Sequence, residues 1–261
     1  MFKQFSSGVT HFLGATLFLK ENKMLYFYVW PIVVAFVYYF ILIGLIFNFS
    51  GVLTESLFGK YLPTKEAVNT SEIAWFKWLS FFSIKGFLSI LSGVIIFFIS
   101  SKLGKYIVLI LLAPVFSLLS EKVEEIKTGK NFPFEFIQFL KDIIRGIFIA
   151  IRNLILELSL VGLFLVIGLF SGPLAIFVVP ILWIIGAYFF GFSMLDYYCE
   201  RRKMSINESI KFIRKYRYYT LGNGLCYSIL DSLPFIGIVF APINGVVGAT
   251  LGILDLEQKK S

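Results

Sequence analysis

Long apolar runs separated by charged segments dominate the hydrophobic pattern of this chain. Residues 25–47 carry no charged side chain, and residues 81–119 are almost as apolar over a longer stretch. A helix rises about 1.5 Å per residue and a bilayer core is about 30 Å thick, so the first run can cross a membrane. The second run is longer than a crossing needs and has to tilt, kink or project. The pattern predicts a transmembrane helix at 25–47 and a second helix at 81–128 that extends into the cytoplasm.

Two later apolar segments are each interrupted by a proline. Residues 154–195 break at Pro173, and residues 221–254 break at Pro234. Proline removes a helical hydrogen bond and marks turns, so each segment predicts a helical hairpin. The arm at 221–233 would measure about 20 Å as a helix, which is shorter than the hydrocarbon core. We expect the second hairpin to enter the membrane without crossing it, whereas the arms of the first fit either partial or full crossing.

Three segments of mixed polarity have the spacing of helices that lie on a membrane surface. They fall at residues 1–24, 133–153 and 205–219, where apolar positions recur at helical spacing beside polar or basic ones. Ser205 and Glu208 stand in the pattern of a capping box. Residues 48–80 are polar and mixed in charge, and they predict an external loop.

Composition supports a membrane protein and excludes a soluble domain. The chain is 58% hydrophobic and only 15% charged, with a mean hydropathy of +0.84. We therefore expect an all-α integral membrane protein with a single membrane domain. Its net charge of +8 is better explained by orientation and anionic lipid than by nucleic acid, which we do not expect as a partner.

The distribution of basic residues predicts the orientation. Residues 120–153 hold six Lys or Arg and residues 196–219 hold seven, whereas residues 48–80 hold three. By the positive-inside rule the two basic segments and both termini face the cytoplasm, and residues 48–80 lie outside.

The chain offers little material for catalysis or metal binding. His11 is the single histidine, and Cys199 and Cys226 have no metal-ligand spacing. No nucleophile stands with a base in a catalytic pattern, and no Gly-rich phosphate loop is present. We expect no enzyme activity, no cofactor and no metal.

The most distinctive stretch follows the second apolar run. Residues 111–129 read LLAPVFSLLSEKVEEIKTG, with an Ala-Pro pair, two leucines, spaced acids and a closing glycine. This stretch resembles the signature of the CysZ-type sulfate permeases and the related etoposide-induced membrane proteins. The likeness continues in FVVPILWIIGAYFFGFSMLDYY and DSLPFIGIVFAPINGVVGAT. The residues that carry it in a structural role are Pro114, Glu121, Glu124, Pro180, Asp196, Pro234 and Pro242.

The resemblance implies a multi-pass protein of the bacterial inner membrane, with two long transmembrane helices and two partly inserted hairpins. It also implies a homo-oligomer surrounded by membrane lipids. The activity it implies is entry of sulfate that supplies cysteine synthesis, by a permease or channel for sulfate or a related small oxyanion. The alternative is a membrane assembly or scaffold protein that has the same fold and transports nothing.

One departure from the family concerns the anion site. The sulfate motif implied by the resemblance has a Gly, an aliphatic residue and two arginines ahead of the first membrane helix. Here the corresponding stretch reads ENKMLYFYVWP and contains no arginine. Asn22 and Lys23 are the polar candidates at this position, and a single lysine lacks the two-pronged geometry of a guanidinium.

Three further basic residues are candidates for an anion path. Lys102 and Lys105 interrupt the second apolar run, and charges inside a membrane commonly face water or a bundle interior. Their other interpretation is a position near an interface, because the helix is longer than the membrane. Arg152 stands at the mouth of the first hairpin and has the chemistry to bind an oxyanion, with a lipid-phosphate contact as the alternative.

The acids of the signature stretch predict where the second helix leaves the membrane. At 100° per residue, Phe116, Leu119, Val123 and Ile126 share one helix face and the three glutamates share the other. We therefore expect Glu121, Glu124 and Glu125 outside the bilayer, paired with Arg145 or with the basic segment 201–217. Gly129 is the expected end of the helix.

Overall fold

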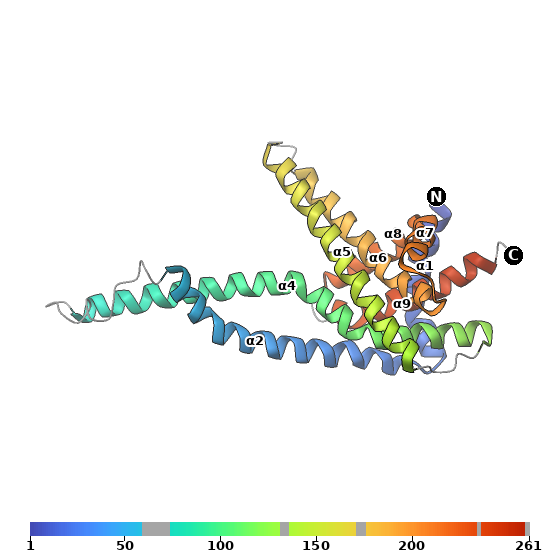
Figure 1. Ribbon diagram of the computed structural model, residues 1–261, viewed down its shortest axis with the longest axis horizontal. Helices are drawn as coiled ribbons and strands as arrows, with labels where there is room; N and C mark the ends of the chain where they lie inside the picture. Colours follow the sequence, from blue (N-terminus) through green and yellow to red (C-terminus); the bar gives the residue numbers. More distant parts are fainter. Residues whose placement is uncertain (59–73, 131–135, 171–175, 234–235, 259–261) are drawn as a thin grey trace. The chain divides into compact units, whose positions relative to one another are not determined.

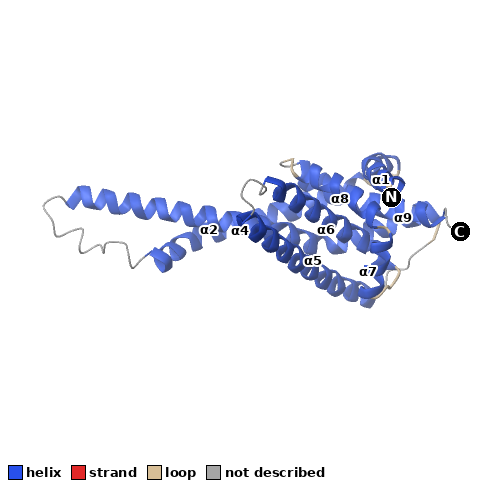
Figure 2. Ribbon diagram, turned by 90° about the horizontal axis from the view of Figure 1, so that it is seen from above, coloured by secondary structure: helices blue, strands red, loops and turns tan. Residues whose placement is uncertain are grey.

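A computed structural model describes residues 1–58, 74–130, 136–170, 176–233 and 236–258 of the chain. Its regular elements within these ranges are all helices (Figures 1 and 2). The chain forms two compact parts, residues 1–34 with 108–261 and residues 35–107, which we describe separately. The all-α class expected from the sequence is confirmed.

The helices follow the chain in a simple order. A long N-terminal helix and a short 3-10 turn precede the first long apolar helix, and six further helices follow within the described residues. The elements are α1 (Phe2–Glu21), η1 (Leu25–Tyr28), α2 (Val29–Phe58), α4 (Ala74–Thr128), α5 (Phe136–Phe170), α6 (Val178–Arg201), α7 (Ile206–Lys215), α8 (Arg217–Asp231) and α9 (Ile236–Gln258).

The prediction of a loop over residues 48–80 is wrong at both ends. Helix α2 continues to Phe58 and α4 begins at Ala74, so only residues 59–73 lie outside the described helices. An apolar run of sequence ends where the membrane ends, but a helix ends where its backbone hydrogen bonding stops. Residues 48–58 contain no proline, and their polarity alone does not interrupt the backbone bonding.

The amphipathic segment at 133–153 and the first arm of the hairpin at 154–195 are one helix. α5 runs without a break from Phe136 to Phe170. The sequence change from amphipathic to apolar alters what the helix faces, and it leaves the backbone hydrogen bonding intact.

The expected surface helix at 205–219 is shorter than its pattern. α7 covers Ile206–Lys215, and the last residues of the segment belong to α8. The capping box is confirmed, because Glu208 N–H donates to Ser205 Oγ and Ser205 N–H donates to the Glu208 carboxylate. The hydrogen bond from the Ser205 amide lowers the pKa of Glu208.

Four stretches of the described helices are long and apolar enough to cross a membrane. They are Leu25–Ser56, Ile144–Gly168, Pro180–Arg201 and Ile236–Gln258. Protein surrounds the last one, whose apolar window is 78% buried, whereas the window of Ile144–Gly168 is only 12% buried. α8 has 15 residues, about 22 Å of helix, and is shorter than a bilayer core. The degree to which each hairpin crosses stays a prediction.

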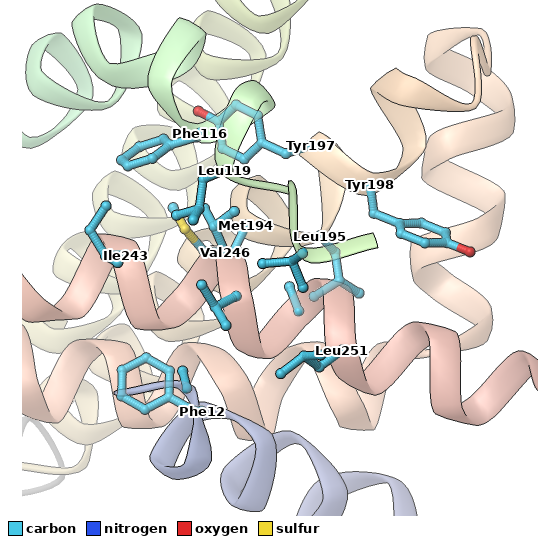
Figure 3. Close-up of a cluster of buried hydrophobic side chains, with 14 of the residues drawn as sticks. Phe12, Phe116, Leu119, Met194, Leu195, Tyr197, Tyr198, Ile243, Val246 and Leu251 are labelled. Atoms are coloured by element: carbon cyan, nitrogen blue, oxygen red, sulfur yellow. The ribbon is translucent and has the colours of Figure 1, made fainter. Parts of the chain in front are cut away.

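The core of the larger part lies where α1, α6, α8 and α9 pack together. Figure 3 shows Phe12 of α1, Met194 of α6 and Val246 of α9 among its buried side chains, with Phe116 and Leu119 of α4 beside them. All five are at most 2% exposed. This apolar cluster holds the helices that carry the ionic groups described below.

Small residues allow α6 and α8 to approach each other closely. A Cβ added at Gly224 would collide with the carbonyl oxygen of Ala187, and one added at Gly191 would collide with that of Thr220. Close contact of small residues is how helices associate in lipid, where the hydrophobic effect gives no drive. The close contact fixes α8 to α6.

The smaller part, residues 35–107, contains a set of hydroxyl groups between its two helices. Thr54 of α2 and Ser92 of α4 are fully or almost fully buried, and their oxygens lie 3.2 Å apart. Ser89 donates to Ser50 at 3.5 Å. Hydroxyls that bond across helices in this way stabilise helix pairs inside a membrane.

The prolines of the signature have different positions. Pro114 and Pro242 lie inside continuous helices, α4 and α9, and Pro180 lies in the first turn of α6. The first turn tolerates proline because its amide needs no helical partner. Pro234 is outside the described residues.

Candidate functional site

A group of ion pairs joins α4, α6 and α9 near their charged ends. Glu124 of α4 lies 2.6 Å from Arg201 and 3.5 Å from Arg202. Arg202 also reaches Glu257 of α9 at 3.4 Å, and the Tyr198 hydroxyl donates to the same carboxylate at 2.5 Å. The expected pairing of the signature acids with the basic segment 201–217 is therefore confirmed for Glu124.

Two details of the acidic stretch differ from the helical-wheel expectation. Glu124 is 4% exposed and so belongs to the buried face of α4, while Ile126 is 44% exposed. A carboxylate can be buried here because Arg201 neutralises it across the interface. Glu121 and Glu125 are partly exposed, and burial raises the pKa of Glu121 against the opposing effect of Arg201. Gly129 has φ +70° and ends α4 as expected.

Arg145 takes different partners from those expected. Its guanidinium donates to Asp196 at 2.9 Å and to Ser209, and it lies 3.8 Å from Glu200. It makes no ion pair with the glutamates of α4 within the described residues. Of the two partners suggested by the sequence, the structure thus pairs Glu124 with the basic segment and not with Arg145. Asp196 and Glu200 stand one turn apart on α6 and lie closer to Arg145 than the glutamates of α4 do. Separation along the sequence does not reveal this.

A third ionic contact fixes α1. His11 Nε2 is 3.1 Å from Asp255, which also lies 3.2 Å from Lys127 of α4. The single histidine is thus part of a helix-to-helix contact. Groups of three or more His, Cys, Asp or Glu that could hold a metal do not occur among the described residues.

One pocket differs from these networks because two arginines and no acid are among the residues that line it. A cavity of about 300 Å³ lies between α5, α6 and α7. Arg152 of α5 and Arg214 of α7 line it together with Tyr188 of α6 and Ser159. Its other lining side chains are apolar, namely Leu156, Leu160, Phe189, Phe192 and Ile210.

Neighbouring side chains orient Arg152 toward this pocket. One of its amino groups donates to Asn153 at 2.9 Å, and its guanidinium lies 5.3 Å from the centre of the Phe192 ring. Asn153 is itself fully buried and donates to Ser193 of α6. The guanidinium has five N–H donors, so this arrangement leaves donors for a guest molecule. Arg214 makes no ion pair with any described residue.

Arg145 and Arg152 show how two similar residues come to differ. They stand seven residues apart and so lie on nearly the same face of α5. Asp196 neutralises Arg145, while no acid lines the pocket of Arg152. An apolar cavity with two guanidinium groups and a phenol can accept an oxyanion, and the residues that line it include no anionic side chain to attract a cation.

Comparison with known proteins decides which family this arrangement belongs to. Residues 11–242 match the family described as sulfate transporter CysZ/etoposide-induced protein 2.4. The chain belongs to this family. The resemblance in its signature stretches is therefore confirmed.

Several relatives in the CysZ family are named sulfate transporter CysZ. The protein of Vibrio parahaemolyticus serotype O3:K6 is 31% identical over 53% of this chain and 56% of its own length. That of Pseudomonas aeruginosa strain LESB58 is 28% identical over 70% of this chain and 74% of its own length. That of Pseudomonas fluorescens strain Pf0-1 is 30% identical over 67% and 69%. The first match thus spans about half of that relative. With its apolar helices, this member of the CysZ family is a multi-pass membrane protein.

The departure from the CysZ-family sulfate motif can now be described structurally. Asn22 caps the end of α1 and donates its side-chain amide to Phe18, and Lys23 follows with φ +58°. The backbone amides of Lys23 and Met24 donate to Lys20 and Leu19 of the same helix. These two amides are used in ending α1. The Lys23 side chain is exposed and remains a candidate.

The structure describes the side chains of only some of the other residues predicted to bind an anion. Lys102 and Lys105 lie in α4, but their side chains are outside the described set. Arg152 lies in the pocket. Arg214 and Tyr188 are its partners, and sequence reasoning missed both. Arg214 looked like one of seven basic residues of a surface segment, and only the fold brings it across to α5.

Proposed function

We propose that this protein is a permease or channel that carries sulfate or a related small oxyanion across a membrane. The observation that carries the proposal is the pocket between α5, α6 and α7, with two arginines and no acid. Membership of the CysZ family and the printed names of its relatives support sulfate as the substrate. Supply of sulfur for cysteine synthesis is part of the same proposal.

The chemistry of the pocket suits partial dehydration of a dianion. Two guanidinium groups match the two charges of sulfate, and each can present parallel N–H donors to two oxygens. The Tyr188 and Ser159 hydroxyls are additional donors. At about 30 Å³ per water, a cavity of about 300 Å³ also has room for the water that an anion keeps.

The position of the two arginines suits an entrance to a path. Arg152 stands eight residues into the apolar stretch Ile144–Gly168, about 12 Å along the helix, while Arg214 belongs to the amphipathic helix α7. An anion would meet Arg214 first and Arg152 second. Conduction needs contacts that are strong enough for entry and weak enough for release, which two partly solvated arginines can provide.

The surrounding expectations belong to this proposal too. The protein would lie in a bacterial inner membrane with both termini in the cytoplasm, as the excess of basic residues in 120–153 and 196–219 suggests. We also propose a homo-oligomer. Non-helical backbone at membrane depth, which the sequence leads us to expect at the two hairpin turns, needs protein or water around it.

A second candidate is a membrane assembly protein of the same fold that transports nothing. The specific observation in its favour is the stretch before Pro31, which has no arginine and whose Lys23 and Met24 amides are used in ending α1. If the protein were such an assembly protein, the main role of its charged residues would be structural, as in the ion pairs of Glu124 with Arg201 and Arg202.

Transport assays distinguish the two candidates. Purified protein in liposomes is expected to pass labelled sulfate faster than protein-free liposomes, and unlabelled sulfite, thiosulfate or molybdate should compete according to their likeness to sulfate. Liposomes containing the heat-denatured protein are the control for leakage. Flux equal to that of empty liposomes, for labelled sulfate and for each of the other three anions assayed in labelled form, would rule out transport and favour the assembly protein.

A further inference from the structure

A second concave surface lies on the other side of α7, at its junction with α6. It is a groove of about 570 Å³, open to solvent, and we call it the α6–α7 groove. Four basic side chains line it, and a methionine, a phenylalanine and a glutamate complete it. They are Arg202, Lys203, Lys211 and Lys215, with Met204, Phe212 and Glu208.

A row of aromatic rings supports the cations of this groove. Phe212 stacks on Tyr198 with ring centres 5.9 Å apart, and it contacts the Tyr216 ring at a tilted angle with centres 5.0 Å apart. Arg202 lies 4.5 Å from the Tyr198 ring centre, and Lys215 lies 5.6 Å from that of Tyr216. Contact with a ring face holds a cation in position and, unlike a carboxylate, adds no negative charge.

The acids around the groove leave it positively charged. Glu208 is engaged in the capping box of α7, where it accepts from the Ser205 amide. Glu124 and Glu257 contact Arg202 from the interior. Lys211 and Lys215 make no ion pair with any described residue, and Glu208 is the one acid among the residues that line the groove. Arg202 has carboxylate partners, so the net positive charge of the groove comes from its three lysines.

Lys203 has an unusual backbone for its residue type. Its φ is +54°, in the left-handed region that favours glycine. Its backbone amide donates to the main-chain carbonyl of Glu200, and that of Met204 donates to the main-chain carbonyl of Cys199. Many helices end in this pattern with glycine at the position of Lys203. A lysine here accepts backbone strain and adds a charge to the groove.

We propose that the α6–α7 groove binds the headgroup phosphate of an anionic phospholipid. The groove has the positive charge that a phosphate needs, and Met204 and Phe212 offer apolar surface beside it for the glycerol and upper acyl carbons. Clusters of basic residues beside membrane helices attract anionic lipid by about the same mechanism in many proteins. The groove is shallower than the pocket of Arg152, which suits a ligand that remains anchored in a bilayer.

The test measures lipid binding to the full chain in neutral detergent. Native mass spectrometry with phosphatidylglycerol and with phosphatidylcholine is expected to give adducts of the anionic lipid at much lower concentration. Each lysine near a membrane surface contributes about a fivefold effect, so Lys211→Gln with Lys215→Gln should weaken phosphatidylglycerol binding roughly 25-fold. Equal binding of the two lipids, or no change in the double variant, would overturn the proposal.

A pair of glycine variants separates binding from folding. Lys203→Gly should keep or raise the thermal midpoint, because glycine accepts the positive φ, and should weaken phosphatidylglycerol binding about fivefold. Lys23→Gly is the matched control, since Lys23 has φ +58° at the end of α1 and does not line the groove. Equal loss of lipid binding in both variants would contradict the site. If inorganic phosphate alone bound the groove as tightly as phosphatidylglycerol, the groove would be assigned to free phosphate and the lipid proposal would be overturned.

Discussion

Replacing Arg152 with alanine is expected to reduce the initial rate of sulfate uptake into proteoliposomes by about tenfold or more. Hydrogen bonds to charged groups contribute about 1.5–3 kcal/mol each, and the pocket has no other cation at this depth among its lining residues. Arg152→Lys should recover part of the rate, since it restores the charge without the two-pronged donor geometry. The measurement is uptake of labelled sulfate at concentrations below saturation.

Arg214 and Arg217 provide the internal comparison for this prediction. Arg214→Ala should also slow uptake because Arg214 lines the pocket, whereas Arg217→Ala should leave the rate unchanged. Arg217 is exposed, stacks on Tyr218 at 4.9 Å and lies outside the pocket. If all three alanine variants slowed uptake equally, a general loss of positive surface charge would explain the effect and the pocket would not.

Replacing Glu124 with glutamine is expected to destabilise the protein by about 3–5 kcal/mol. The carboxylate and the Arg201 side chain are both 5% exposed, and removing one partner of a buried ion pair leaves the other charge uncompensated. Arg202 would lose the same partner at 3.5 Å. The midpoint of thermal unfolding in detergent should fall clearly, and chemical denaturation should give the free-energy difference.

Two further variants decide whether the ion pair is responsible. Glu125→Gln should change stability by no more than about 1 kcal/mol, because Glu125 pairs with Lys122 at 3.2 Å on the surface. Combining Glu124→Gln with Arg201→Met should recover part of the loss, since no buried charge then lacks its partner. Additive effects of the two substitutions would mean that Glu124 and Arg201 stabilise the protein independently.

The fold could be predicted as far as hydropathy and proline positions reach. The long apolar runs, the start of α7 at its capping box and the end of α4 at Gly129 follow from local chemistry. The extension of α2 to Phe58 and the continuity of α5 through Asn153 could not be predicted in the same way. Polar residues change what a helix faces without ending it, so hydropathy boundaries and helix boundaries differ.

The sequence allowed one of the two arginines of the candidate site to be predicted and not the other. Arg152 could be singled out because a guanidinium within an apolar segment is costly and needs a reason. Its partner Arg214 is 62 residues further along the chain, among several basic residues with the same local pattern. For the same reason, the sequence did not show that Arg145 pairs with Asp196 while Glu124 pairs with Arg201. Charge alone does not tell which acid lies across a helix interface.

The pocket and the ion-pair groups together suggest a division of roles among the basic residues. Arg145, Arg201 and Arg202 have carboxylate partners and hold helices together. Arg152 and Arg214 line a cavity without one and are available to an anion. An acid placed in this cavity, as in Ile210→Glu, would give Arg152 and Arg214 a carboxylate partner and make them less available to an anion.

The location of a bound anion tests the central claim most directly. Selenate has the shape and charge of sulfate and scatters anomalously at the selenium edge, so a structure of the protein with selenate reports where the anion binds. We predict a selenate between α5, α6 and α7, with oxygens at about 2.7–3.2 Å from the guanidinium nitrogens of Arg152 and Arg214. An ordered selenate at Lys23 or in the α6–α7 groove, with none beside Arg152, would contradict the account.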